Sequence, residues 1–373
     1  MAAVPQKKFV PTKPPFWHDP RIRALIFQVI VLVAVFAFFS YILGNVLHNL
    51  EKRGISTGFD FLSTEAGFGI IQTLIDYNES STYGHTFVVG LLNTILVSAL
   101  GIVFATILGF VIGIARLSHN WLVAKLAAAY IEIFRNIPLL LQIFFWYFAV
   151  LRALPSPRQS WAFGELAFLN IRGLYLPEPE FSFVWVAFFV AIVLVFVWAK
   201  RTGKPVFYFA LLLALPLLWV APWEVPQLKG FNFQGGITVI PELMALLIAL
   251  SIYTAAFIAE IVRSGIQGIN YGQTEAAQAL GLRQSHILRL VIIPQAMRII
   301  IPPLTSQYLN LTKNSSLATA IGYPDLVAVF AGTTLNQTGQ AVEVIAMTMA
   351  VYLTLSLSIS LLMNWYNLKA QVT

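Results

Sequence analysis

The sequence contains no cysteine and few charged residues. The absence of cysteine from all 373 residues excludes disulfides, thiolate metal sites and thiol redox chemistry. Charged residues make up 10% of the chain and hydrophobic residues 58%, whereas soluble domains carry roughly 25% charged residues. This balance excludes a large soluble core and indicates a protein that crosses a membrane several times.

Motifs for metal and nucleotide binding are also lacking. The five histidines are scattered, with no pair at ligand spacing, so no metal site is expected. The phosphate-binding pattern G-x-x-x-x-G-K-[ST] does not occur, because Gly203-Lys204 is followed by Pro205 and lacks the upstream glycine. We therefore expect no catalytic site and no cofactor on this chain; if its work consumes ATP, another chain must bind it.

Apolar runs long enough to span a bilayer recur along the chain. The first, 24–43, follows a Pro-rich basic segment, 1–23, and about 20 residues without an A-x-A-like cleavage site favour a transmembrane helix over a signal peptide. The further predicted spans are 87–115, one within 126–151, 183–199, 206–221, 240–262, 297–321 and 342–365. The sequence thus predicts an all-α polytopic membrane protein with about eight transmembrane helices.

Several segments depart from regular spans. Segment 44–85 is predicted to be extracytoplasmic, either as an amphipathic helix along the outer interface or as a partly ordered loop. Pro138 is expected to break or kink the third span, and Pro302-Pro303 together with the polar segment LTKNSSL to break the seventh. Small residues along 87–115, such as Gly109 and Gly113, suit close helix packing in lipid.

The basic residues predict the orientation. With the N-terminus inside, about 15 of the 23 Lys and Arg residues fall on the cytoplasmic side and about 6 outside. This bias predicts that both termini, including a tail at 366–373, and the loop around Glu275 are cytoplasmic. The basic charge is thus a topology signal and gives no reason to expect a nucleic acid partner.

A compact polar loop, 263–298, interrupts the apolar sequence. Within it we expect a short helix from Glu275 to Leu280, with Thr274 as its N-cap and Glu275 in the first turn, where the helix dipole favours a negative charge. Gly281 suits the left-handed position that ends a helix. From these local features alone, an ordinary membrane loop and a docking helix are equally good interpretations.

The motifs decide between them by resemblance. The segment EAAQALG, followed after nine residues by VIIP, resembles the EAA loop of type I ABC importer permeases, with Val291 and Ile293 where Ile and Leu are usual. The flanking AAFIAEIVRSGIQGI and KNSSLATAIG resemble the polar amino acid uptake branch. Together with GLLNTILVSALG, RNIPLLLQ and LPSPRQS, they make the chain similar to the larger permease subunits of bacterial general L-amino acid importers.

The resemblance implies a fold, a role and a set of partners. It implies a permease domain at 86–365 in the bacterial inner membrane, with an insert at about 152–230 that carries two extra helices. It also implies that the transporter imports L-amino acids with broad specificity. The implied partners are an ATP-binding cassette ATPase dimer that holds ATP and Mg, a second permease subunit in a heterodimer (a homodimer stays open), and a periplasmic amino-acid-binding protein. The residues implied to couple this chain to the ATPase are Gly272, Glu275, Ala276, Ala277 and Gly281.

Polar residues at membrane depth are candidates for a substrate pathway, because they are costly in a bilayer unless they face a cavity or a partner. An amino acid needs donors for its carboxylate and acceptors for its ammonium group. The candidates are Arg135, Gln142, Glu260, Lys313, Asn314 and Ser315. Structural pairing is the alternative for two of them, Glu260 with Arg263 and Arg135 with Glu132.

Two other classes of transport protein were weighed. An ion-coupled secondary transporter explains eight spans and broken helices, but it leaves the Glu275–Gly281 segment unexplained and predicts an inverted repeat that is not evident. A channel requires a selectivity filter or a ring of charges, and neither is evident in the sequence.

Overall fold

A computed structural model of the chain describes residues 19–52, 54, 57–180, 183, 185, 190, 192 and 222–372. This part is mostly helical, as predicted, and contains five helices long and apolar enough to cross a membrane, or six if one bent pair counts as a span. The predicted spans 183–199 and 206–221 lie outside the described residues apart from four isolated positions. The total of about eight spans therefore stays a prediction.

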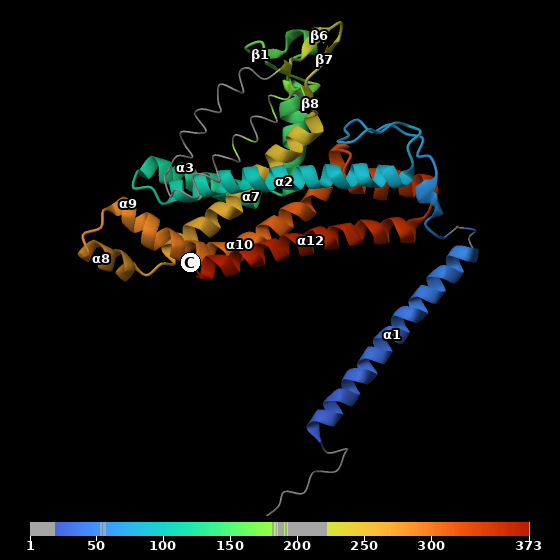
Figure 1. The fold of residues 1–373 in the computed structure, drawn as a ribbon, viewed down its shortest axis with the longest axis horizontal. Coiled ribbons are helices and arrows are strands. Elements are labelled where there is room, and N and C mark those ends of the chain that lie inside the picture. The colour runs from blue at the N-terminus through green and yellow to red at the C-terminus, as the bar shows by residue number, and fades with distance from the viewer. Residues whose placement is uncertain are drawn as a thin grey trace, which may run out of the picture. The chain divides into compact units, whose positions relative to one another are not determined.

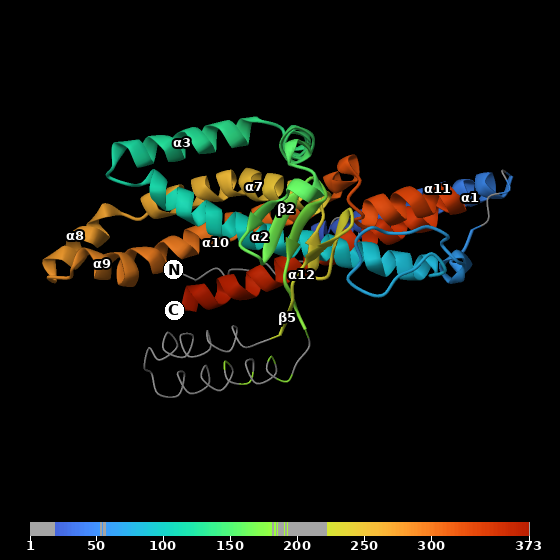
Figure 2. The ribbon, with the colours of Figure 1, turned by 90° about the horizontal axis from the view of Figure 1, so that it is seen from above.

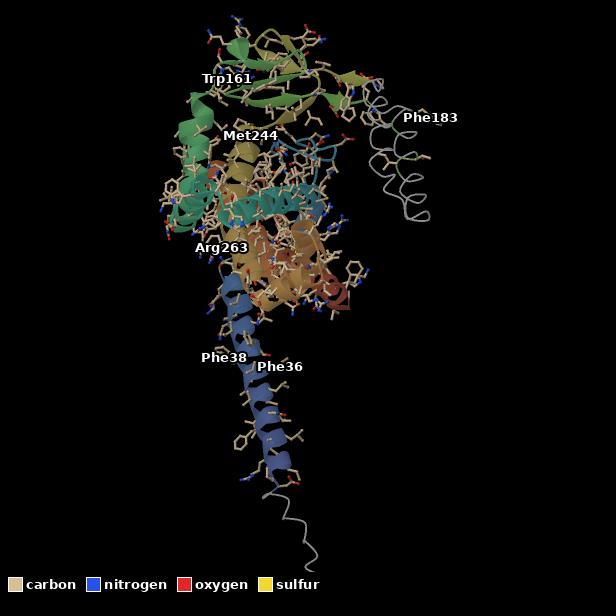
Figure 3. The ribbon with its side chains drawn as sticks, turned by 90° about the vertical axis from the view of Figure 1, so that its left-hand side faces the viewer. Phe36, Phe38, Trp161, Phe183, Met244 and Arg263 are labelled. Atoms are coloured by element: carbon tan, nitrogen blue, oxygen red, sulfur yellow. The ribbon has the colours of Figure 1, made fainter. Side chains whose placement is uncertain are left out.

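The first helix, α1, covers Pro20–Lys52 and contains the candidate span Ile22–Asn49, which is longer than the predicted 24–43. It belongs to a unit that is separate from the rest of the chain. None of the side chains in its most apolar stretch is buried and most are exposed; Phe36 and Phe38 are examples (Figure 3). Large apolar side chains on every face are what a helix surrounded by lipid requires.

The second unit is built around helix α7, which covers Pro241–Gln267. It packs along α2 (Tyr83–Arg116) and α10 (Ile293–Asn314), which lie beside it in Figure 2. A Cβ atom on Gly109 of α2 would lie 2.6 Å from the Cβ atom of Ile258 on α7. The predicted close packing of the small residues is therefore confirmed, because only glycine permits this approach.

The predicted break at Pro138 is confirmed. Helix α3 (Trp121–Asn136) ends just before the proline, and the following α4 (Leu139–Phe144) continues through a π-helical turn and a short 3₁₀ turn to Ala153. The two halves meet at 104°. The buried Gln142 satisfies this corner, because its amide donates to the carbonyls of Phe134 and Ile137, both at 3.0 Å.

Of the two features predicted to break the seventh span, Pro302-Pro303 does not do so, and the α-helix ends only within the polar LTKNSSL segment. Helix α10 continues through both prolines, although the missing amide hydrogens leave two carbonyls of the preceding turn without their α-helical donors. The regular helix gives way at Ser315 to a 3₁₀ helix, Ser315–Ile321, and ends at Gly322, whose φ is 77°. After it come a π-helical segment, Val327–Thr334, the short α11 (Leu335–Thr338) and the last helix, α12 (Ala341–Val372).

The two alternatives for segment 44–85 are now resolved. Between α1 and α2, the only helical element among the described residues is a single 3₁₀ turn, Asp60–Ser63, so the amphipathic helix is not formed and the segment is a loop. Within the loop, Tyr77 donates to the Phe68 carbonyl at 2.8 Å. Asn93 of α2 holds the loop against that helix by donating to the Gln72 carbonyl at 2.9 Å.

Short antiparallel strands, which the sequence did not predict, form a layer before α7. One sheet has the order β1-β2-β3-β8, made of Trp161–Phe163, Ala167–Asn170, Gly173–Leu176 and Ile237–Val239. Two strand pairs complete the layer: β4 (Glu178–Pro179) with β5 (Trp223–Glu224), and β6 (Gln227–Lys229) with β7 (Asn232–Gln234). Strand β8 leads directly into α7, which runs from this layer to the end where α8 lies (Figure 1).

Candidate functional site

The EAA-like segment forms a short exposed helix, α8, at Tyr271–Ala279. Its N-cap is Asn270, whose Oδ1 accepts from the Gly272 amide at 2.8 Å. The prediction of Thr274 as the N-cap is wrong, because Asn270 caps the helix one turn earlier. Glu275 consequently lies in the second turn, so the helix dipole gives its charge little stabilisation.

The end of α8 is a Schellman motif, as the prediction for Gly281 implies. The Gly281 amide donates to the Gln278 carbonyl at 2.8 Å, and the Leu282 amide donates to the Ala277 carbonyl at 3.2 Å. Gly281 has a φ of 73°, in the left-handed region that favours glycine. The helix is therefore capped at its start by the Asn270 side chain and at its end by backbone hydrogen bonds, all within the chain.

One face of α8 is anchored and the other is free. Ala277 is buried against Ile287 of α9 (Gln284–Ile287) and Ile292 of the π-helical turn Leu288–Ile292. On the other side, Glu275 and Ala276 are exposed, and Tyr271 and Leu280 are 69% and 81% exposed. Leu280 therefore leaves a large apolar side chain uncovered in the single chain.

A second polar group lies at the α8 end of α7, in a cavity of about 260 Å³. In Figure 3, Met244 marks the end of α7 near the strands, where Trp161 of β1 is labelled. Arg263 marks the opposite end of the same helix. The charged residues that line the cavity are Arg116, Glu132, Arg135, Glu260 and Arg263. The structure thus brings together two of the predicted pathway residues, Arg135 and Glu260.

The alternative of structural pairing holds for one of these two residues. Arg263 donates to both carboxylate oxygens of Glu260, with Nε at 3.0 Å from Oε2. Arg135 lies over the Phe257 ring, with its Cζ 5.0 Å from the ring centre. In the described part of the chain, no ion pair joins Arg135 to Glu132. Arg135 therefore keeps its charge unpaired beside the Glu260–Arg263 pair.

The other predicted pathway residues do not line this cavity. Gln142 is buried at the corner between α3 and α4, where its Oε1 has no hydrogen-bond partner. Ser315 is fully buried and donates to the Thr312 carbonyl at 2.8 Å. Near the C-terminal end of α10, Lys313 is exposed and Asn314 is half-buried.

Sequence reasoning missed a buried acidic group, Asp325. Its carboxylate accepts from the Ala328 amide at 2.8 Å, from the Thr319 hydroxyl at 3.3 Å and from the Tyr352 hydroxyl at 3.4 Å. Burial raises the pKa of this carboxyl to about 6. Its position just after Pro324 and before a helical segment is a capping signal that the sequence does carry.

Comparison with known proteins agrees with the resemblance. Residues 101–371 match the family described as binding-protein-dependent transport system inner membrane component. The chain is 58% identical to a putative amino-acid ABC transporter permease, YhdX, of Escherichia coli, with 94% of each chain covered. It is 50% identical to the general L-amino acid transport system permease AapQ of Rhizobium johnstonii, covering 94% of this chain and 93% of that one.

A third relative is the glutamate/glutamine/aspartate/asparagine transport system permease BztB of Rhodobacter capsulatus, 43% identical with 94% of each chain covered. All three relatives are matched over nearly their whole length. The chain therefore belongs to the family of binding-protein-dependent transport system inner membrane components, as an amino acid ABC transporter permease.

Proposed function

We propose that this permease, with broad specificity, imports L-amino acids across the bacterial inner membrane. Import is driven by ATP, which a separate ATPase dimer binds together with Mg. A second, related permease completes a heterodimer, and a periplasmic amino-acid-binding protein delivers the substrate. Both termini and α8 lie on the cytoplasmic side, in agreement with the distribution of Lys and Arg. The names of AapQ and BztB support broad specificity, because they refer to several amino acids.

The observation that carries the proposal is the construction of α8. Its two caps and the buried Ala277 hold it in place, while Glu275, Ala276 and Leu280 are exposed. A rigid small helix with small side chains enters a groove of another protein at low entropic cost. The residues that couple transport to ATP hydrolysis are then Gly272, Glu275, Ala276, Ala277 and Gly281, with the last two acting through the shape of the helix.

The substrate pathway passes the cavity that Arg135 and Glu260 share. Arg135 offers guanidinium donors to a carboxylate, and Glu260 offers an acceptor to an ammonium group once Arg263 turns away. Gln142, Lys313, Asn314 and Ser315 remain proposals for the same pathway. Lys313 and Asn314 are accessible in the single chain, where a second permease subunit would face them.

Charge reversal on α8 tests the proposal. Glu275→Arg is expected to abolish ATP-driven amino acid uptake and leave membrane insertion intact, because Glu275 is exposed and makes no contact that the fold needs. The matched control is Glu165→Arg, at an equally exposed glutamate in the β1–β2 turn. Uptake is measured in proteoliposomes that contain the importer purified with its partners. Normal uptake by Glu275→Arg, or uptake that does not depend on ATP, would contradict the proposal.

A further inference from the structure

A second charged cavity, of about 450 Å³, lies at the other end of α7, beside the strand layer. Its charged residues come from three separate segments: Arg152 from the turn after α4, Arg172 from the β2–β3 turn and Glu242 from the first turn of α7. Tyr147 and the apolar Ile71 and Ile240 complete the wall. Glu242 precedes Glu260 by 18 residues, so this cavity lies about 27 Å along α7 from the first one.

The charges of this cavity are not neutralised by one another. In the described part of the chain, the only carboxylate within 4.0 Å of a guanidinium group belongs to the Glu260–Arg263 pair. Arg152 lies over the rings of Tyr147 and Phe148, with its Cζ 5.4 and 5.9 Å from their centres, and it also donates to the Tyr147 hydroxyl. These contacts hold the guanidinium group in place and leave most of its five N–H donors available.

The other two charges are held in a similar way. Arg172 uses one of its five N–H donors on the Phe231 carbonyl, at 3.1 Å. Glu242 accepts from the Tyr147 hydroxyl at 2.7 Å through Oε1. A carboxylate has about four lone-pair sites, so Oε2 remains free to accept from a ligand. The cavity therefore presents two guanidinium groups and one carboxylate, each positioned by a contact that leaves further hydrogen-bonding capacity.

We propose that this cavity binds an α-amino acid with an acidic side chain before it enters the permease. The inference rests on the proposed function and adds a second binding site, which takes the acidic amino acids among the substrates. The two carboxylates of such a ligand pair with Arg152 and Arg172, and its ammonium group pairs with Glu242. The excess of one positive charge favours a ligand with one excess negative charge. A lipid phosphate group would also bind the arginines, but it has no ammonium group to pair with Glu242, and the negative charge of Glu242 repels it.

Equilibrium binding of radiolabelled L-glutamate to the purified full-length chain in lipid nanodiscs tests the inference. Glutarate, which lacks the ammonium group, and L-lysine serve as competitors. Glutarate is expected to compete about tenfold less well than L-glutamate, because it cannot pair with Glu242. In Glu242→Gln this gap closes, since L-glutamate binding falls about tenfold while that of glutarate does not fall. A gap that persists in Glu242→Gln would overturn the inference, as would absence of saturable L-glutamate binding or L-lysine competing as well as L-glutamate.

Arginine substitutions locate the site. Arg152→Gln and Arg172→Gln are each expected to weaken L-glutamate binding about tenfold or more. Arg152 makes no hydrogen bond that is needed for the strand layer, so its substitution remains informative even if Arg172→Gln loosens the β2–β3 turn. The matched control is Arg158→Gln, because Arg158 is also exposed and stacked on an aromatic ring but does not line this cavity. Unchanged binding in Arg152→Gln would overturn the inference.

One further variant separates the two cavities, and the assay separates the two proposals. If Glu260→Gln abolishes L-glutamate binding while Arg152→Gln and Glu242→Gln leave it intact, L-glutamate binds in the cavity around Glu260 and the inference is wrong. Binding to the nanodisc protein needs no ATPase, so it is independent of coupling through α8. Normal ATP-driven uptake together with unchanged binding in the outer-cavity variants would contradict this inference alone, whereas uptake without ATP would contradict the proposed function.

Discussion

The two ends of α7 are built in different ways. At one end, α8 is held by short-range contacts, because its caps lie in 270–282 and its buried partners lie between Ile266 and Ile292. At the other end, the cavity of Arg152, Arg172 and Glu242 (the outer cavity) is lined by residues that range in sequence from Ile71 to Glu242. The neighbouring sheet pairs β3 with β8 across more than 60 residues. The first end is one exposed element built from neighbouring residues, and the second is a surface assembled from distant segments. A substitution at the first end should therefore affect coupling, and the same substitution at the second should not.

Replacement of the exposed Leu280 is expected to have the largest effect on ATP-driven uptake. Leu280→Asp is expected to abolish ATP-driven uptake, since an exposed leucine at the tip of α8 is replaced by a charge that an apolar groove would have to desolvate. Leu166→Asp is the matched variant at the strand end, where Leu166 is 57% exposed, and it should retain uptake. Uptake and recovery of the ATPase with the purified permease are both measured. Equal losses in the two variants would remove the distinction between the two ends.

A matched pair of glycines gives an intermediate effect. Gly281 and Gly164 both have positive φ, 73° and 66°, and a Cβ atom at either would meet no other atom within 4 Å. Valine at either position therefore costs roughly the same 1–2 kcal/mol of backbone strain. Gly281→Val is expected to lower ATP-driven uptake severalfold by distorting the end of α8, and Gly164→Val to leave uptake unchanged. Thermal stability of both purified variants serves as the control, and it should fall by similar amounts.

The smallest effect is expected from the N-cap. Asn270→Ala removes the acceptor for the Gly272 amide, which costs about 1 kcal/mol of local helix stability. Uptake is expected to fall less than in Gly281→Val, and Asn270→Asp is expected to restore it, because aspartate caps as well as asparagine. If Thr274→Ala lowered uptake more than Asn270→Ala, α8 would begin at Thr274 and the observed cap would be contradicted.

The same contrast explains what could be predicted from the sequence. The end of α8 at Gly281 and the break at Pro138 depend on one residue and its chain neighbours, and both predictions are confirmed. The start of α8 was missed by one turn because Asn270 and Thr274 are both good capping residues, and the local pattern does not rank them. Pro302-Pro303 were expected to help break the seventh span, but α10 continues through them because Ile300 and Leu304, on either side of the prolines, are buried in the core beside α7.

The strand layer and the outer cavity could not be predicted for a different reason. The strands have two to four residues, too few for an alternating pattern to be recognised. The charges of Arg152, Arg172 and Glu242 meet only because the antiparallel pairing of β3 with β8 returns the chain to α7. The pairing of Glu260 with Arg263 was foreseen as an alternative, because the two lie three residues apart on one helix.

The central claim, that α8 contacts an ATPase, is tested most directly by cross-linking. Because the chain has no cysteine, Ala276→Cys introduces a single thiol on the exposed face of α8, and Ala162→Cys introduces one in the exposed strand β1. Each importer is purified with its partners, treated with a short thiol-to-amine cross-linker and analysed by mass spectrometry. The account predicts that Ala276→Cys cross-links to an ATP-binding subunit and Ala162→Cys does not. Absence of that product from Ala276→Cys, or its formation from Ala162→Cys, would contradict the account.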